Sequence, residues 1–244
     1  MLLSQIKNFV IESVIPSYCY GCKKESTYLC EDCFEIINSF SKSICPHCKQ
    51  ALPFGKLPDT CRHELSLNRI FSCADYKDVR IKKLIKDLKY NYSFALAKPL
   101  AEFGYWWLQK NEYTDEIKNN VSLIASVPLH KNKLKKRGFN HAEYLARHFG
   151  KLLDIPVANN FLIKTRPTIP QVETKTKDER QENLKNAFST TGTNTTGLSD
   201  NPVVDKTILL IDDVLTTGST LRECAKVLRK NGAKEVWALT IAQD

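Results

Sequence analysis

The sequence predicts an α/β protein with a parallel sheet at its core and a cysteine-rich zinc ribbon module near its amino terminus. Residues 208–211 are a continuous aliphatic run, which is typical of a strand buried on both faces of a parallel sheet. Residues 221–230 follow helical spacing and stop before a glycine signal. The cysteines concentrate between Cys19 and Cys61. At 244 residues the chain is long enough for one α/β core and a small additional module.

Residues 1–15 carry apolar side chains at helical spacing and predict an amphipathic helix that docks on the protein's own body. The segment lacks a basic start and contains Lys7 and Glu12, which argues against a signal peptide. No stretch of the sequence is a candidate membrane span. We therefore expect a cytoplasmic protein.

Residues 16–68 form the predicted double zinc ribbon, in which cysteines occur in pairs separated by two residues. Thiolates at this spacing can bind one tetrahedral zinc ion, whereas a disulfide between them is strained. Disulfides are the alternative only for a secreted protein, and nothing in the sequence indicates export. The first site is expected at Cys19, Cys22, Cys30 and Cys33.

A second site begins with Cys45 and Cys48, and Cys61 is its expected third ligand. The place where another pair would put a fourth cysteine is not a cysteine, so His63 is our candidate fourth ligand. His47, inside the second pair, is the competing choice, and an empty second site is a further alternative. The module is thus expected to hold one or two structural zinc ions.

Residues 69–244 form the predicted α/β domain, which begins with a strand at residues 70–76 and a helix at residues 79–90. The helix has an apolar stripe and a row of lysines, for which a solvated face is the favoured explanation. Cys73 in the strand and Cys224 near the end of the chain are expected to be ordinary buried thiols.

A buried strand is predicted at residues 121–127, and the basic segment 131–137 that follows is expected to be a loop. The net charge of +9 permits attraction to polyanions. If both basic stretches lie on one face, they would offer phosphate contacts to a nucleic acid strand. The helix at residues 141–153 carries His141 and His148, which we expect to be ordinary surface or core histidines.

Two polar stretches interrupt the second half of the domain. Residues 165–183 lack apolar periodicity, which favours a mobile flap over a ligand. Residues 189–202 are a low-complexity connector, and residues 235–242 supply a last strand.

The turn between the strand at 208–211 and the last helix combines carboxylates with hydroxyls. The free amides of the helix N-terminus favour a phosphate there, and Gly218 lets the backbone approach it closely. Asp212 and Asp213 can accept hydrogen bonds from a vicinal diol or face a magnesium ion. Diol and phosphate together describe a ribose 5-phosphate. The hydroxyls that can donate to the phosphate belong to Thr216, Thr217, Ser219 and Thr220.

Other phosphate-binding loops do not match this turn. A Walker loop requires G-x-x-x-x-G-K-[ST] and a dinucleotide fingerprint requires G-x-G-x-x-G, whereas the turn has one glycine and no lysine. An ATPase loop and a Rossmann dinucleotide site are therefore excluded. A buried strand with an aspartate turn and a Ser/Thr cap is the alternative that involves no ligand.

The string ILLIDDVLTTGSTL resembles the phosphoribosyl pyrophosphate (PRPP) signature of type I phosphoribosyltransferases. The resemblance implies a type I phosphoribosyltransferase-like sheet that binds PRPP or a related phosphoribosyl ligand, usually with Mg²⁺. It further implies that Asp212 and Asp213 hold the ribose hydroxyls and that the segment from Val214 to Thr220 holds the 5-phosphate. The fold alone does not settle an activity.

Further motifs make nearly the whole chain resemble the ComF family, also called the ComFC or GntX-like family. The segments VPLH at 127–130 and RGFN at 137–140 resemble its signatures, although His141 stands where glutamine is usual. The resemblance implies a role in DNA uptake and natural transformation, with contacts to single-stranded DNA and a competence helicase as a partner. The spaced residues that resemble the family pattern are Gln171, Arg180, Asn183 and Phe188.

The segment after the strand at 121–127 lies where open α/β sheets place their ligands. His130, Lys131 and Arg137 supply donors that could face a pyrophosphate group, although a solvent-exposed basic loop explains them as well. In an active enzyme the catalytic candidates are Asp212, Asp213 and Arg137. The alternatives to a DNA-uptake protein are an active phosphoribosyltransferase on an unidentified base or nucleophile, and a catalytically silent PRPP sensor.

Overall fold

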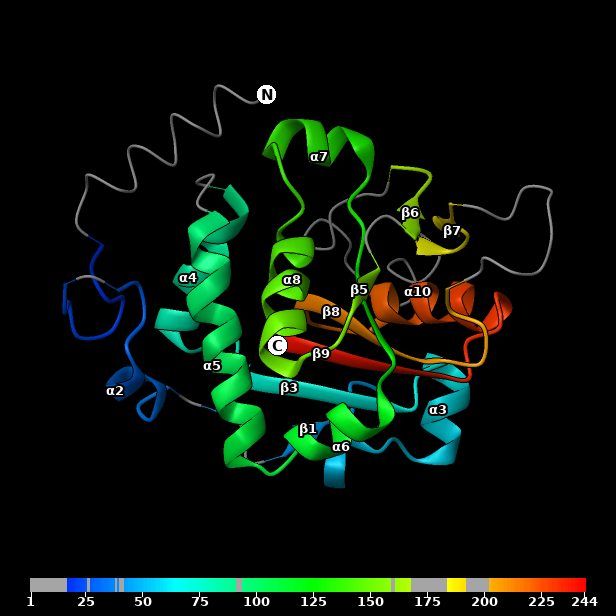
Figure 1. Ribbon diagram of the computed structural model, residues 1–244, viewed down its shortest axis with the longest axis horizontal. Helices are drawn as coiled ribbons and strands as arrows, with labels where there is room; N and C mark the ends of the chain where they lie inside the picture. Colours follow the sequence, from blue (N-terminus) through cyan, green and yellow to red (C-terminus); the bar gives the residue numbers. More distant parts are fainter. Residues whose placement is uncertain are drawn as a thin grey trace.

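The computed structural model describes residues 17–25, 27–37, 39, 42–90, 94–158, 161–167, 184–191 and 202–244. At its centre lies a parallel sheet with the strand order β3-β9-β8-β4-β5, which confirms the predicted α/β core (Figure 1). Its strands are β3 (Arg69–Asp75), β4 (Leu123–Ser126), β5 (Val157–Ala158), β8 (Thr207–Leu215) and β9 (Glu235–Gln243). Within the described ranges, every helix is too short or too polar to span a lipid bilayer.

Helices cover both faces of this sheet, with α4, α5 and α8 on one side and α3 and α10 on the other (Figure 1). Successive residues of a strand point to opposite faces, so Leu209 belongs to the core beneath the first group and Leu210 to the core beneath the second. Burial on both faces explains the continuous aliphatic run. The helices are α3 (Asp59–Leu65), α4 (Val79–Tyr90), α5 (Ala97–Lys110), α8 (His141–Leu153) and α10 (Ser219–Lys230).

Shorter elements complete the described structure. The antiparallel pair β6-β7 lies beside α10, and the pair β1-β2 belongs to the second cysteine group. These elements are α2 (Glu31–Phe34), β1 (Ser43–Ile44), β2 (Ala51–Leu52), α6 (Thr114–Asn120), α7 (Lys131–Arg137), β6 (Leu162–Lys164) and β7 (Phe188–Thr190), with 3-10 turns at Pro53–Gly55 and Phe94–Leu96.

The basic segment 131–137 was wrongly expected to be a loop, because the structure forms helix α7 there. The backbone N–H of Asn132 donates to Nδ1 of His130, 3.2 Å away, which caps the start of the helix. Gly138 ends the helix in the left-handed region at φ 76°, a conformation that glycine adopts without strain. The segment buries no side chain and so lacks the apolar periodicity by which helices are recognised.

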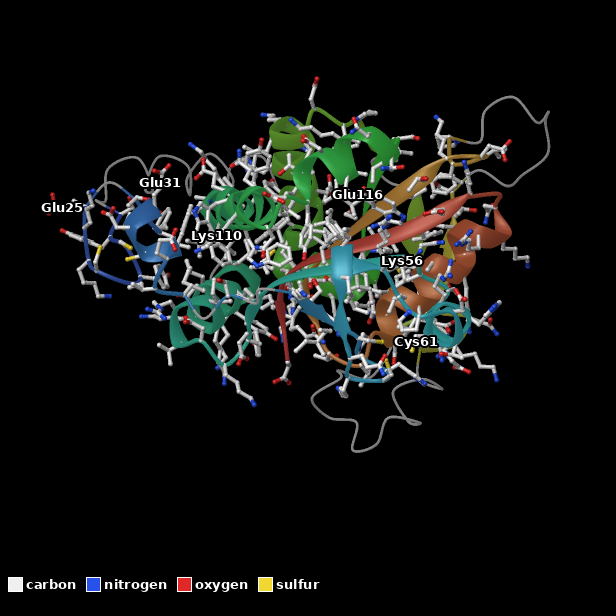
Figure 2. The ribbon with its side chains drawn as sticks, turned by 90° about the horizontal axis from the view of Figure 1, so that it is seen from below. Glu25, Glu31, Lys56, Cys61, Lys110 and Glu116 are labelled. Atoms are coloured by element: carbon white, nitrogen blue, oxygen red, sulfur yellow. The ribbon has the colours of Figure 1, made fainter. Side chains whose placement is uncertain are left out.

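The two cysteine groups pack on opposite faces of the sheet. The first group belongs to the core of α5, where the ring of Phe34 lies 5.6 Å from the rings of Phe103 and Trp106. The second group belongs to the core of α3 and α10. In Figure 2, Glu25 and Glu31 of the first group lie at one end of the molecule, and Cys61 of the second lies toward the other. The division of the chain at residues 15 and 68 stays a prediction.

Several sequence-based expectations fall outside the described residues. They are the amphipathic helix at 1–15, most of the flap at 165–183, most of the connector at 189–202, and the motif residues Gln171, Arg180 and Asn183.

Candidate functional site

A cavity of about 320 Å³ opens at the carboxyl ends of β4 and β8, where parallel sheets bind ligands. This volume is at the lower end of the range for small-molecule sites. The cavity combines the end of α4, helix α7, the start of α8, strand β6 and the β8–α10 turn. Its polar and charged lining includes Tyr76, Lys89, Tyr90, Lys133, Arg137, His141, Lys164, Asp212, Asp213, Thr216, Ser219, Thr220 and Asp244.

The β8–α10 turn has the geometry of a phosphate-binding turn. Strand β8 continues through both aspartates to Leu215, further than the sequence indicated, and α10 begins at Ser219. Gly218 adopts the left-handed region at φ 77° as the N-cap of α10. The hydroxyl oxygens of Thr217 and Ser219 lie 2.8 Å apart and hold the turn together. The first amides of a twelve-residue helix therefore border the cavity.

Asp213 is buried and paired within the protein. Its Oδ2 atom lies 2.8 Å from Nζ of Lys89 and 3.0 Å from Nε2 of His141. Burial alone would raise the pKa of Asp213, but Lys89 and His141 outweigh it and hold the pKa below its usual range. The same contact raises the pKa of Lys89 against the effect of its burial. Asp213 is thus a stable carboxylate beside a stable ammonium.

Asp212 has a different environment, although it is the neighbouring residue. It lines the cavity, is partly exposed, and its Oδ1 accepts the backbone N–H of Asp213 at 2.9 Å. Burial and the negative charge of Asp213 raise its pKa to about 7, against the lowering effect of Lys89 and Lys164. Asp212 therefore changes its charge near neutral pH.

Arginine and lysine side chains give the rest of the cavity a positive charge. The guanidinium of Arg137 lies 3.2 Å from Nδ1 of His141, and it also stacks over the ring of Tyr90 at 5.0 Å. Lys133 and Lys164 add two amines, and burial together with Lys133 lowers the pKa of Lys164 to about 8. These cations suit an anionic ligand such as a phosphate or pyrophosphate.

The structure brings most of the predicted ligand residues to this one cavity. Those that line it are Arg137, Asp212, Asp213, Val214, Thr216, Gly218, Ser219 and Thr220. Thr217 supports the turn through Ser219. His130 is buried as the cap of α7, and neither His130 nor the exposed Lys131 is part of the cavity lining.

Sequence reasoning missed two residues of the site. Lys89 was assigned to a solvated helix face, and His141 was expected to be an ordinary histidine. Both border a buried stripe at helical spacing, since Lys89 follows Ile85 by four residues and His141 precedes Leu145 by four. A polar residue at the edge of a buried stripe and at the end of a helix can reach a site at the edge of the sheet. This position was the signal that could have identified both residues.

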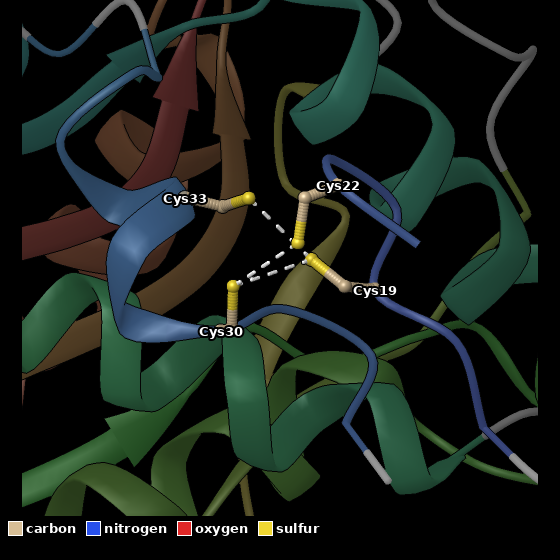
Figure 3. A group of neighbouring side chains, drawn as sticks. All are labelled: Cys19, Cys22, Cys30 and Cys33. Atoms are coloured by element: carbon tan, nitrogen blue, oxygen red, sulfur yellow. Dashed lines mark hydrogen bonds between the residues drawn. The ribbon is translucent and has the colours of Figure 1, made fainter. Parts of the chain in front are cut away.

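The first cysteine group has the geometry of a structural zinc site. The Sγ atom of Cys19 lies 3.7 Å from that of Cys30 and 3.6 Å from that of Cys33, and Cys22 lies 3.6 Å from Cys30. A tetrahedron of Zn–S bonds near 2.3 Å places its sulfur atoms about 3.8 Å apart. Figure 3 shows the four sulfur atoms turned toward one another. The group can therefore hold zinc.

The second cysteine group brings together three thiols, those of Cys45, Cys48 and Cys61, within 4.8 Å of one another. Within the described part of the chain, neither His63 nor His47 joins this cluster. Cys61 and His63 both lie on helix α3, where positions two apart point to different sides, and His63 is exposed while Cys61 is buried. The fourth ligand at this site thus remains a proposal.

The oxygen and nitrogen donors of the cavity leave one carboxylate suited to Mg²⁺. His141, Asp212 and Asp213 place donor atoms within 4.8 Å of one another, but Lys89 already pairs with Asp213. Mg²⁺ is usually bound by one or two carboxylates together with phosphate oxygens of the substrate. Asp212 is therefore the residue that would hold Mg²⁺ with a bound pyrophosphate.

Comparison with known proteins agrees with this architecture. Residues 134–244 match the family model of the phosphoribosyl transferase domain, and such domains generally use Mg²⁺. The chain is 34% identical to competence protein F of Haemophilus influenzae over 88% of its own length and 90% of that protein. It is 28% identical to DNA utilization protein YhgH of Escherichia coli over 92% of this chain and 97% of that protein. It is 26% identical to competence protein ComFC of Streptococcus pneumoniae over 91% of this chain and 90% of that protein.

Proposed function

Because the chain belongs to the competence protein F family and carries a phosphoribosyl transferase domain, we propose that it binds PRPP or a related phosphoribosyl ligand during DNA uptake. The single observation that supports this ligand is the cavity at the β8–α10 turn, which combines a helix N-terminus suited to a phosphate with a pair of carboxylates. The turn would bind the 5-phosphate, and the aspartate carboxylates would accept hydrogen bonds from the ribose hydroxyls. Asp212 would hold Mg²⁺ together with the pyrophosphate.

The proposal extends to single-stranded DNA as a second ligand. Helices α4 and α7 are both basic, and both border the same cavity through Lys89 and Arg137. The stacking of Arg137 on Tyr90 joins the ends of the two helices. The two basic stretches therefore share the rim of the cavity, as the phosphate contacts of a single strand require.

The proposed setting is the cytoplasm, with a helicase of the uptake machinery as a protein partner. The family relatives named for competence and DNA utilization support this setting. Reducing conditions would also keep the two cysteine groups as thiolates that can bind zinc.

Calorimetric titration of the zinc-loaded protein with PRPP and Mg²⁺ tests the ligand. We expect saturable binding of PRPP and none of ATP, because the turn lacks the lysine of a Walker loop. Thr216→Val should weaken PRPP binding, since it removes one hydroxyl from the cavity wall. A flat PRPP titration of the wild-type protein would refute the proposed ligand.

The salt dependence of binding to an oligonucleotide tests the DNA contact. Removing three phosphate contacts should reduce the slope of log K against log salt concentration by about 2, since each contact contributes about 0.7 for single strands. The test variant replaces the exposed Lys86, Lys131 and Lys135 by glutamine. The control variant removes the same charge elsewhere, at the exposed Lys98, Lys118 and Lys234. Equal slopes for the two variants would contradict a DNA site at the cavity rim.

A second candidate function is phosphoribosyl transfer itself, with Asp212, Asp213 and Arg137 as the catalytic candidates. The cations around the cavity favour it, because Arg137 and Lys133 can stabilise charge on a departing pyrophosphate. Release of pyrophosphate from bound PRPP in the presence of nucleobases separates a transferase from a silent PRPP sensor. A sensor would bind PRPP and release no pyrophosphate above the rate of the Asp212→Asn variant.

A further inference from the structure

The two carboxylates of the cavity have unequal surroundings. Asp213 is 4% exposed, and one of its oxygen atoms lies within 3.0 Å of both the Lys89 ammonium and the His141 ring. The negative charge of this buried carboxylate is thus balanced by a cation of the protein itself. Asp212 is partly exposed and lines the cavity, and the N–H of Asp213 donates to it.

The contact between Arg137 and His141 fixes the tautomer of the imidazole beside Asp213. A guanidinium can only donate, so Nδ1 of His141 accepts from Arg137 at 3.2 Å. The ring hydrogen of the neutral imidazole then sits on Nε2, which is the atom 3.0 Å from Asp213. The N–H of His141 therefore faces Oδ2 of Asp213 at ion-pair distance, although Oδ2 accepts no hydrogen bond of regular geometry within the described residues.

Lys89 completes this arrangement from a different element. It is the penultimate residue of α4, and the rest of its helix is anchored by buried Ile81, Leu84, Ile85 and Leu88. Only 19% of the Lys89 side chain is exposed, so its ammonium is held at the acid pair and not in bulk solvent. A fixed ammonium and a fixed imidazole thus converge on the same carboxylate oxygen.

We propose that Lys89 and His141 are positioning residues that hold Asp213 as an internal counter-ion, and that Asp212 is the carboxylate that accepts the ribose hydroxyls of the ligand. This inference rests on the proposed function, because it assigns unequal roles within the same cavity. It differs from the sequence-based expectation, in which both aspartates hold the ribose. In this arrangement Asp213 does not contact the ligand, and it affects binding only through its contacts with Lys89 and His141.

The first test compares the two aspartates in calorimetric titrations of the zinc-loaded full chain with ribose 5-phosphate. Asp212→Asn removes the charged acceptor of the hydroxyls and should weaken binding by more than about tenfold. Asp213→Asn leaves Lys89 without its partner but removes no ligand contact, so it should weaken binding clearly less. A loss for Asp213→Asn equal to that for Asp212→Asn would overturn the inference.

The second test is a double-mutant cycle on Lys89 and Asp213. Lys89→Met leaves a buried carboxylate unpaired, and we expect a loss of affinity of more than about tenfold. Lys89→Met combined with Asp213→Asn leaves no unpaired charge and should bind within about threefold of the wild-type protein. Lys98→Met, at an exposed lysine of α5 that does not line the cavity, is the control and should change nothing. If the double variant binds no better than Lys89→Met alone, Asp213 meets the ligand itself and the inference is wrong.

Thermal unfolding of the same variants provides a readout that needs no ligand. The double variant should be more stable than Lys89→Met alone, because it removes the unpaired buried charge. A double variant no more stable than the single one would also overturn the inference. If the wild-type protein binds neither ribose 5-phosphate nor PRPP, the proposed function fails. The stabilities of the single and double variants still decide whether Lys89 and Asp213 form a compensating pair.

His141 is tested by a conservative replacement. His141→Gln keeps a side-chain N–H that can donate to Asp213, and it should retain affinity for ribose 5-phosphate within about threefold. His141→Leu removes the donor at similar size and should weaken binding by clearly more. Equal losses for the two variants would show that His141 only fills space.

Discussion

At the residue scale, the charge of Asp212 is sensitive to pH near neutrality. Its pKa is raised to about 7 by burial and by the neighbouring Asp213, so the carboxylate gains a proton as the pH falls through neutrality. A protonated Asp212 is a weaker acceptor for ribose hydroxyls than the carboxylate. The affinity for ribose 5-phosphate should therefore fall by up to about fivefold between pH 7 and pH 6.

Calorimetry at a series of pH values checks this dependence, with Asp212→Asn as the control. The ligand phosphate also takes up a proton near pH 6, but this affects both proteins equally and cancels in the comparison. His141 and Lys164 titrate in the same cavity, and their contribution remains in the control variant as well. Parallel profiles for the two proteins would contradict the prediction.

The residues of this site differ in how far the sequence reveals them. Asp212 and Asp213 directly follow the aliphatic run at 208–211 and precede the turn, so their place at the site was predictable from the chain alone. Lys89 and Asp213 are far apart in the sequence and are joined only by the packing of α4 against the sheet. The position of Lys89 beside the buried stripe sets it apart from the exposed Lys86, but it does not reveal that Asp213 is the partner.

At the element scale, the β8–α10 turn depends on the conformation of Gly218. Gly218 has φ 77°, in the left-handed region that residues with a Cβ atom rarely adopt. A Cβ atom added there would lie 3.3 Å from the side chains of Leu65 and Pro46. Gly218→Ala should therefore lower the free energy of unfolding by roughly 1–2 kcal/mol. It should also weaken the binding of ribose 5-phosphate, because the turn supplies the phosphate site.

Gly232→Ala is a matched control for this change. Gly232 follows α10 at φ 92°, and its added Cβ atom would lie 3.2 Å from Val204, at a place that does not line the cavity. Chemical denaturation should show a similar loss of stability in both variants, while calorimetry should show a loss of affinity only for Gly218→Ala. Unchanged affinity in Gly218→Ala would remove the turn from the ligand site.

Helix α7 carries Lys133 and Arg137 into the cavity and depends on its cap at His130. His130→Ala should destabilise the protein by about 1 kcal/mol, because it removes an N-cap acceptor. His130→Asn restores an acceptor and should recover both stability and affinity for PRPP. If His130→Asn recovers stability but not affinity, His130 donates to the ligand directly, as its place in the sequence indicated.

This helix also shows which kind of element the sequence does not reveal. The strands and the helices α4 and α8 have apolar stripes, and the sequence placed them within a few residues. Helix α7 buries no side chain, so its sequence shows no hydrophobic periodicity. The ends of the helix are set instead by its hydrogen-bonded caps. The cation-rich loop predicted at 131–137 was an error of this kind.

At the scale of the whole molecule, the two cysteine groups support different parts of one cavity. In the first group, the Tyr20 hydroxyl donates to Asp87 at 2.6 Å, and Asp87 lies two residues before Lys89 on α4. In the second group, Pro46 and Leu65 lie against Gly218 at the phosphate turn. The sequence predicted both groups but not this division, because cysteine spacing identifies ligands without indicating which face of the sheet each group covers.

The division predicts that loss of each metal site has a different effect. Cys61→Ser should release about one equivalent of zinc and weaken the binding of inorganic phosphate, since α3 would no longer be fixed beside Gly218. Cys30→Ser should also release about one equivalent, but it loosens the contact of the first group with α4. It should therefore weaken the binding of ribose 5-phosphate and leave that of inorganic phosphate nearly unchanged.

Metal analysis and titrations with the two ligands check this prediction, with Cys73→Ser as the control. Cys73 is buried in β3 and belongs to neither group, so its replacement should change stability without releasing zinc. If Cys61→Ser retains the zinc content of the wild-type protein, three thiols do not make a metal site here. If it loses zinc while phosphate affinity stays the same, the second group stabilises its own face of the sheet and has no influence on the turn.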